Sequence, residues 1–206
     1  MTDDSKSAAN KTARNEKKEA YLRAIYDRYT AEFRAGGDQD ASSLASKTHI
    51  AMNVVLQNDR AKTPGSENIQ CGKGCNHCCH EAVEIWPQEA VLLASVVRET
   101  GMMLDMARLE RQSQFTVDTW RQQPMADKAC LFLGGDGACT VYESRPNACR
   151  KLLVVTDPAL CDAEKSKPDS VGRWFSWEAE LMESAALEVF GAGLMPQSLL
   201  TALNAK

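Results

Sequence analysis

Apolar residues recur every three or four positions along much of the chain, which predicts amphipathic helices. The first predicted helix runs from about residue 13 to 35, where Gly36-Gly37 ends it, and the second from about 41 to 60. Their apolar faces consist of Leu22, Ile25, Tyr29 and Phe33, and of Leu44, Thr48, Met52 and Val55. Because a short glycine-containing loop joins them, these helices are predicted to form an antiparallel hairpin.

The rest of the chain is also predicted to be mostly helical. Pro87 suits the first position of a helix that continues to Thr100, and a further helix spans residues 106–120. The last two are predicted at 175–190 and 196–203. One β-hairpin is expected at residues 130–142, with a four-residue glycine loop that pairs Leu133 with Ala138 and Phe132 with Cys139. The predicted fold class is mainly α: a small helical domain with one short β-hairpin, organised around a cysteine metal cluster.

The same patterns suggest how the chain is organised. Residues 1–12 are polar and predicted to form a disordered tail, and residues 13–60 form the helical hairpin. Residues 61–206 are predicted to be a cysteine-cluster metal-binding domain with C-terminal helices. We expect this domain and residues 13–60 to form one compact unit.

Composition narrows the function classes. The 206 residues carry a net charge of −4 with both signs mixed, so no basic surface for nucleic acid is indicated. Neither a secretory signal nor an apolar stretch of membrane-spanning length is evident. A cytoplasmic location without membrane contact is therefore expected. In that reducing compartment, clustered cysteines more often bind metal or do redox chemistry than form disulfides.

The first cysteine group reads Cys71-Gly-Lys-Gly-Cys75-Asn-His-Cys78-Cys79-His80. Two residues separate Cys75 from Cys78, a spacing that lets two thiolates of one tight turn bind a single metal ion. The neighbouring side chains of Cys78 and Cys79 diverge in regular backbone, so both reach one ion only if the backbone bends sharply. Otherwise one of them packs or serves a second ion.

The second group contains Cys130, Cys139 and Cys149. Cys149 is placed in the first turn of a short helix that Pro146 begins, where the helix dipole favours a thiolate. The candidate metal ligands are Cys71, Cys75, Cys78, Cys79, Cys130, Cys139 and Cys149. Cys161 lies outside both groups and is expected to be the most tolerant of substitution. His77 and His80 are either additional ligands or neighbours of the metal loop, and His49 is expected to be structural.

Basic residues accompany these motifs. Lys73, Arg145, Arg150 and Lys151 either offset the negative charge of a thiolate centre or are ordinary surface charges.

These motifs resemble the YkgJ-like cysteine-cluster family, described as a zinc- or iron-chelating domain. The resemblance covers residues 71–153: Cys71-x3-Cys75-x2-Cys78-Cys79, then Cys130-Leu-Phe-Leu, then Gly137-Ala-Cys139-Thr-Val-Tyr-Glu-Ser-Arg145-Pro-Asn-Ala-Cys149-Arg150. Family members usually have proline where this chain has Leu131. The related flagellin lysine-N-methylases share the cluster and use an iron-sulfur centre with S-adenosylmethionine. The resemblance therefore implies a zinc or iron ion, or a [4Fe-4S] cluster, as cofactor.

Three functions are compatible with the sequence. The first is a metal-binding accessory or adaptor module, and the second is an iron-sulfur-dependent enzyme for methyl transfer or redox chemistry. The third is thiol redox sensing without a stable metal. No residue is identified as catalytic, and whether the chain is an enzyme stays open. The expected partners are a metal ion and a protein that the sequence does not identify.

Overall fold

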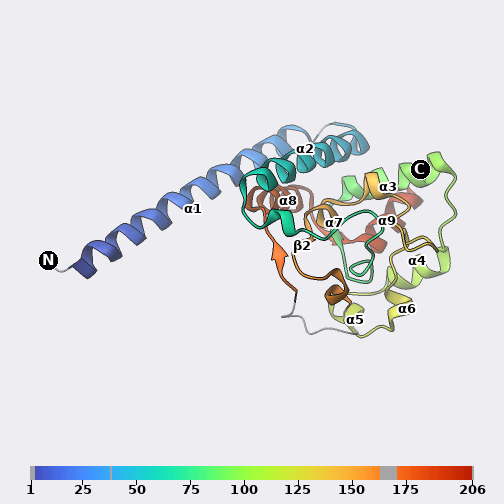
Figure 1. The fold of residues 1–206 in the computed structure, drawn as a ribbon. Helices are drawn as coiled ribbons and strands as arrows, with labels where there is room; N and C mark the ends of the chain where they lie inside the picture. Colours follow the sequence, from blue (N-terminus) through green and yellow to red (C-terminus); the bar gives the residue numbers. More distant parts are fainter. Residues whose placement is uncertain (1–2, 38, 163–170, 206) are drawn as a thin grey trace.

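The computed structural model describes residues 3–37, 39–162 and 171–205, and it is mainly α-helical, as predicted (Figure 1). The α-helices are α1 (Asp3–Ala35), α2 (Ala41–Lys62), α3 (Pro87–Thr100), α4 (Met106–Gln112), α5 (Val117–Arg121), α6 (Met125–Lys128), α7 (Asn147–Lys151), α8 (Trp177–Phe190) and α9 (Met195–Asn204). Short 3-10 helices cover Ser66–Asn68, Tyr142–Ser144 and Pro158–Cys161. The strands are β1 (Glu84–Ile85), β2 (Leu153–Val154), β3 (Arg173–Trp174) and β4 (Gly193–Leu194). Among the described residues, no helix is both long and apolar enough to cross a membrane.

Several predicted helix boundaries agree with the structure, and two differ. Helix α1 begins at Asp3, well before residue 13, and residues 1–2 of the predicted tail lie outside the described residues. The single helix predicted at 106–120 is two helices, α4 and α5. Thr116 divides them because its side chain accepts the backbone N–H of Thr119 and caps a new helix.

One part of the core lies between α1, α2 and α8. Helix α1 packs mainly against α8, and α2 packs mainly against α3, so α1 and α2 are held together through the C-terminal part of the chain. Trp86 is fully buried here, with its ring stacked on Phe190 at 5.4 Å and near Phe33 at 5.9 Å. The N-terminal half of α1 extends away from the rest of the molecule (Figure 1).

The second part of the core lies between α3, α4 and α9. Its buried residues include Ile85, Leu93, Leu109, Phe132 and Leu199. Phe132 belongs to the second cysteine motif, so the apolar core directly supports that segment. The cysteine motifs therefore lie beside a formed core and not on a detached loop.

The strands pair residues that are far apart in sequence. Strand β1 pairs antiparallel with β4, and β2 pairs antiparallel with β3. The hairpin predicted at residues 130–142 is reduced to one bridge, which joins Leu133 to Cys139 and not to Ala138. The predicted register is wrong by one residue because the loop includes Ala138, whose carbonyl accepts the N–H of Gly134 at 2.8 Å.

Candidate metal centre

The two cysteine groups converge on one cavity of about 110 Å³. All seven predicted ligands line it: Cys71, Cys75, Cys78, Cys79, Cys130, Cys139 and Cys149. They come from residues 71–80, which we call the thiol loop, from the turn at 130–139, and from α7. The remaining walls are largely apolar and include Trp120, Phe132 and Met195.

Hydrogen bonds hold the thiol loop against the other segments. The N–H of Cys130 donates to the carbonyl of Cys79 at 2.8 Å, which joins the two cysteine groups directly. The indole N–H of Trp120 donates to the carbonyl of His80 at 2.9 Å. At the other end of the loop, the N–H of Val154 in β2 donates to the sulfur of Cys71 at 3.2 Å. The conformation of the thiol loop is thus fixed by contacts with residues far away in the sequence, and not only by the turn propensity of its own residues.

Backbone N–H groups also face several sulfurs. The amides of His77, Phe132 and Val141 lower the pKa values of Cys75, Cys130 and Cys139, each two residues earlier in the chain. A hydrogen bond to sulfur favours the thiolate, which is the form that binds metal. Thiols with this pattern of donors are suited to zinc or iron, which prefer sulfur ligands.

Burial acts in the opposite direction on the same thiols. It is the largest cause of the raised pKa of Cys149 and raises that of Cys130 to about 11. For Cys78, the hydrogen bond with Cys79 raises the pKa most, followed by burial. Cys149 lies in the first turn of the five-residue helix α7, as predicted, and burial nevertheless raises the pKa of its thiol. A bound cation would compensate for this desolvation.

The basic residues of the motifs have different roles. Arg145 lowers the pKa of Cys139 through its positive charge, and its guanidinium lies 3.7 Å from the centre of the Tyr142 ring. Lys151 instead pairs with Glu180 on α8. Arg145 therefore provides charge compensation beside the thiols, whereas Lys151 ties α7 to α8.

Three other sequence candidates lie at the edge of the site. Neither histidine of the thiol loop, His77 or His80, lines the cavity. Cys161 does not line it either, but its pKa is raised to about 11 by burial and then by Cys78, Cys71 and Cys75. The fold thus brings Cys161 close to the thiol loop, which its position outside both motifs does not indicate.

A buried polar network supports α7 from behind. The carboxylate of Glu89, which is completely buried, accepts the N–H of Asn147 at 2.7 Å and lies 2.9 Å from Nε2 of His49. Arg150, only 2% exposed, donates from Nη2 to Nδ1 of His49 at 3.3 Å. Because an arginine can only donate, Nδ1 is the acceptor and Nε2–H donates to Glu89. Sequence reasoning expected His49 to be structural but did not find Glu89, because the polar residues of this network lie on different helices.

Burial and neighbouring charges shift the pKa values of several residues in and beside this network. Burial and the nearby positive charges of Arg150 and Arg145 lower the pKa of His49 to about 3, so the ring is neutral. Burial raises the pKa of Glu89, and burial together with the charge of Glu89 raises that of Glu183. The network holds the helix that carries Cys149 in place, and it makes that support sensitive to pH.

The cavity gathers the donors without yet arranging them as ligands. Within the described ranges, no three His, Cys, Asp or Glu side chains stand close enough together to hold a metal ion. An ion shared by both cysteine groups would need cysteine side chains brought toward a common point. The number of thiols, the backbone N–H groups that donate to them and the positive charge of Arg145 fit a zinc or iron ion held by sulfur.

The CxxCxxCC family model, described as "Putative zinc- or iron-chelating domain", matches residues 70–169. Residues 70–169 of the chain are therefore similar to this family. The CxxCxxCC segment contains all eight cysteines and both sequence motifs, and its description agrees with the donor set of the cavity. No curated protein and no solved structure matches the chain.

Proposed function

We propose that this protein chelates zinc or iron through the thiols that line the cavity, and that it acts as an accessory or adaptor module. One observation carries the proposal: seven cysteines, from Cys71 to Cys149 in the sequence, line one cavity. The backbone donors to Cys75, Cys130 and Cys139 add support because they favour the thiolate form.

The proposed roles follow from position. Cys75 and Cys78 bind from the thiol loop, and Cys139 and Cys149 bind from the opposite wall. The second set, Cys71, Cys79 and Cys130, supplies alternative ligands or a second ion. Arg145 balances part of the negative charge that several thiolates would bring.

An iron-sulfur centre is the second candidate. A single zinc ion takes four ligands, whereas seven thiols line this cavity. The surplus favours a cluster or two ions. When bound, an iron-sulfur cluster would supply one-electron chemistry, but no residue is assigned to a reaction.

Metal analysis after anaerobic purification tests the proposal. We expect a stoichiometric amount of zinc or iron, with broad visible absorption if the metal is an iron-sulfur cluster and none if it is zinc. Serine substitution of Cys75, Cys78, Cys139 or Cys149 should sharply lower the metal content, because a hydroxyl cannot replace a soft thiolate. The matched control is Cys161→Ser, which removes a thiol that does not line the cavity. Metal content that is retained in the four variants but lost in the control would overturn the ligand assignment.

A further inference from the structure

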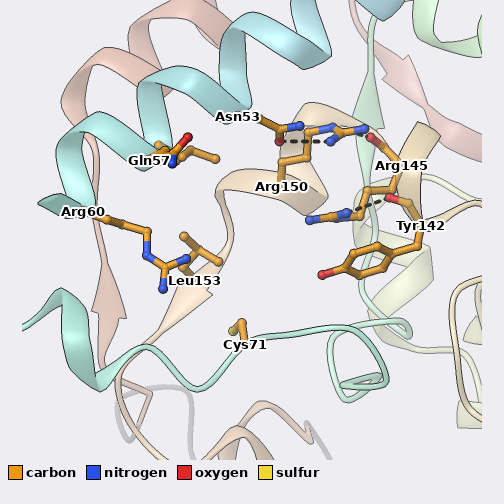
Figure 2. A pocket seen from close by; sticks show the side chains of 9 residues that line it. Asn53, Gln57, Arg60, Cys71, Tyr142, Arg145, Arg150 and Leu153 are labelled. Atoms are coloured by element: carbon orange, nitrogen blue, oxygen red, sulfur yellow. Dashed lines mark hydrogen bonds between the residues drawn. The ribbon is translucent and has the colours of Figure 1, made fainter.

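A second cavity lies beside the thiol cavity, with a volume of about 240 Å³. Its polar lining comes from α2 and from residues 142–150: Asn53, Gln57, Arg60, Tyr142, Arg145 and Arg150 (Figure 2). Cys71, Tyr142 and Arg145 line both cavities, so the two spaces adjoin. We call this second space the arginine pocket.

The arginine pocket concentrates positive charge in a chain whose net charge is −4. Arg60 and Arg145 reach into it from opposite sides, above Cys71 (Figure 2). None of its lining residues, all of which lie in the described part of the chain, is acidic. The ion pairs found among the described residues include neither Arg60 nor Arg145 nor Arg150. Glu89 and Glu143 partly balance the charge of Arg150. Guanidinium groups that lack an ion-pair partner beside a cavity, here those of Arg60 and Arg145, favour an anionic ligand.

Two of these side chains are held in fixed positions. Arg150 donates from Nε to the carbonyl of Arg145 at 2.9 Å and from Nη1 to Oδ1 of Asn53 at 3.0 Å. Arg145 stacks on Tyr142 and donates from Nη1 to the Tyr142 carbonyl at 2.6 Å. That is the single protein acceptor for Arg145 within the described ranges, and a guanidinium has five N–H donors. Arg145 therefore offers preorganised, unused donors to a ligand.

Charge balance for the thiolates explains Arg145 but not Arg60. Arg145 lowers the pKa of Cys139 and lines both cavities. Arg60 lines the arginine pocket and not the thiol cavity, and it comes from a different element, α2. Its position is accounted for if the pocket itself holds an anion.

We propose that the arginine pocket binds a small molecule that carries a carboxylate or phosphate group, next to the thiol cavity. Ligand pockets usually enclose about 300–1,000 Å³, so this smaller space suits a compact metabolite. The inference rests on the arginines alone and is independent of whether the thiols bind metal.

Isothermal titration calorimetry with two probes tests the proposal. The full-length chain is purified anaerobically, and its metal content is measured before the titration. Sodium phosphate and sodium succinate are titrated separately, and sodium chloride at equal ionic strength corrects for screening. Arg60→Gln is compared with Arg111→Gln, which removes the same charge from α4, outside the pocket. We expect saturable binding of at least one probe, weakened about tenfold or more by Arg60→Gln through loss of a charge-assisted hydrogen bond, and unchanged in Arg111→Gln. Which probe binds identifies the chemical group.

The absence of saturable binding of either probe to the wild-type chain would overturn the proposal. Equal affinity in Arg60→Gln would also overturn it, because the anion would then be binding elsewhere, for example at the metal. If circular dichroism shows that Arg60→Gln is misfolded, Gln57→Leu on the same helix face replaces it with the same expectation. A chain that lacks metal but still binds the anion through Arg60 would contradict the proposed function and support the arginine pocket.

Discussion

Replacing His49 with glutamine should reduce the acid sensitivity of the fold. In the native protein, Nδ1 of His49 accepts a hydrogen bond from Arg150, and burial lowers the pKa of the ring to about 3. Protonation would place a second positive charge beside Arg150 and remove that acceptor. Glutamine has no titratable group, and its amide can still donate to Glu89.

The size of the pH effect on folding stability follows from the pKa values of His49 in the folded and unfolded chains. In the unfolded chain the pKa is about 6.5, so the unfolded state binds more protons than the native state at pH values between about 3 and 6.5. The stabilisation is therefore complete above about pH 6.5 and is lost as the pH falls through this window. Between about pH 7.5 and pH 5, the loss is about 2 kcal/mol for His49 alone, at 1.36 kcal/mol for each pKa unit.

Urea unfolding of the wild-type chain and of His49→Gln at these two pH values measures this effect. The variant should be less stable at the higher pH because it loses the Arg150 hydrogen bond, and its disadvantage should shrink by about 2 kcal/mol at the lower pH. Titration of the cysteine thiols and of Glu183 is common to both chains and cancels in the difference. His77→Gln, which changes a histidine outside the network, serves as control. A stability difference between wild type and His49→Gln that is the same at both pH values would refute the reasoning.

Three further changes test how the site is held together. Gly137→Ala should destabilise the fold by about 1–3 kcal/mol, because φ is +77° at this position and a Cβ would lie 2.6 Å from Asn76 of the thiol loop. Gly135→Ala is the control, since a Cβ there would meet nothing within 4 Å. Trp120→Phe should cost about 1 kcal/mol and speed metal release, because the hydrogen bond to the His80 carbonyl is lost; an unchanged release rate would argue against this anchor. Chelation should raise hydrogen exchange in the thiol loop and leave the contact between α1 and α8 protected; equal protection before and after chelation would rule out a structural metal.

The sequence predicted the helices well where apolar periodicity and capping residues agree. Helix α3 begins at Pro87 and ends before Gly101 because proline suits the first turn and Gly101 adopts a positive φ at the C-terminus. The two cysteine groups were predicted to converge although about fifty residues separate them, and seven cysteines from both groups line one cavity.

Features that depend on tertiary contacts were not predictable from local patterns. The pairing of α1 with α8, the two long-range strand pairs and the buried Glu89 join residues far apart in sequence. The arginine pocket was missed for the same reason, because Arg60 belongs to the exposed face of a helix that the fold places opposite Arg145. The turn at 130–142 differed by one residue because a single backbone hydrogen bond decides its register.

The central claim is that the cysteine thiols of the cavity hold the metal ion. The most direct test is X-ray absorption spectroscopy of the anaerobically purified protein, at the absorption edge of the metal that it contains. We predict a first shell dominated by sulfur, at about 2.3 Å if the metal is zinc. The sulfur signal should fall in Cys75→Ser and Cys149→Ser and persist in Cys161→Ser. A first shell of nitrogen and oxygen only, in a protein with full metal content, would contradict the account.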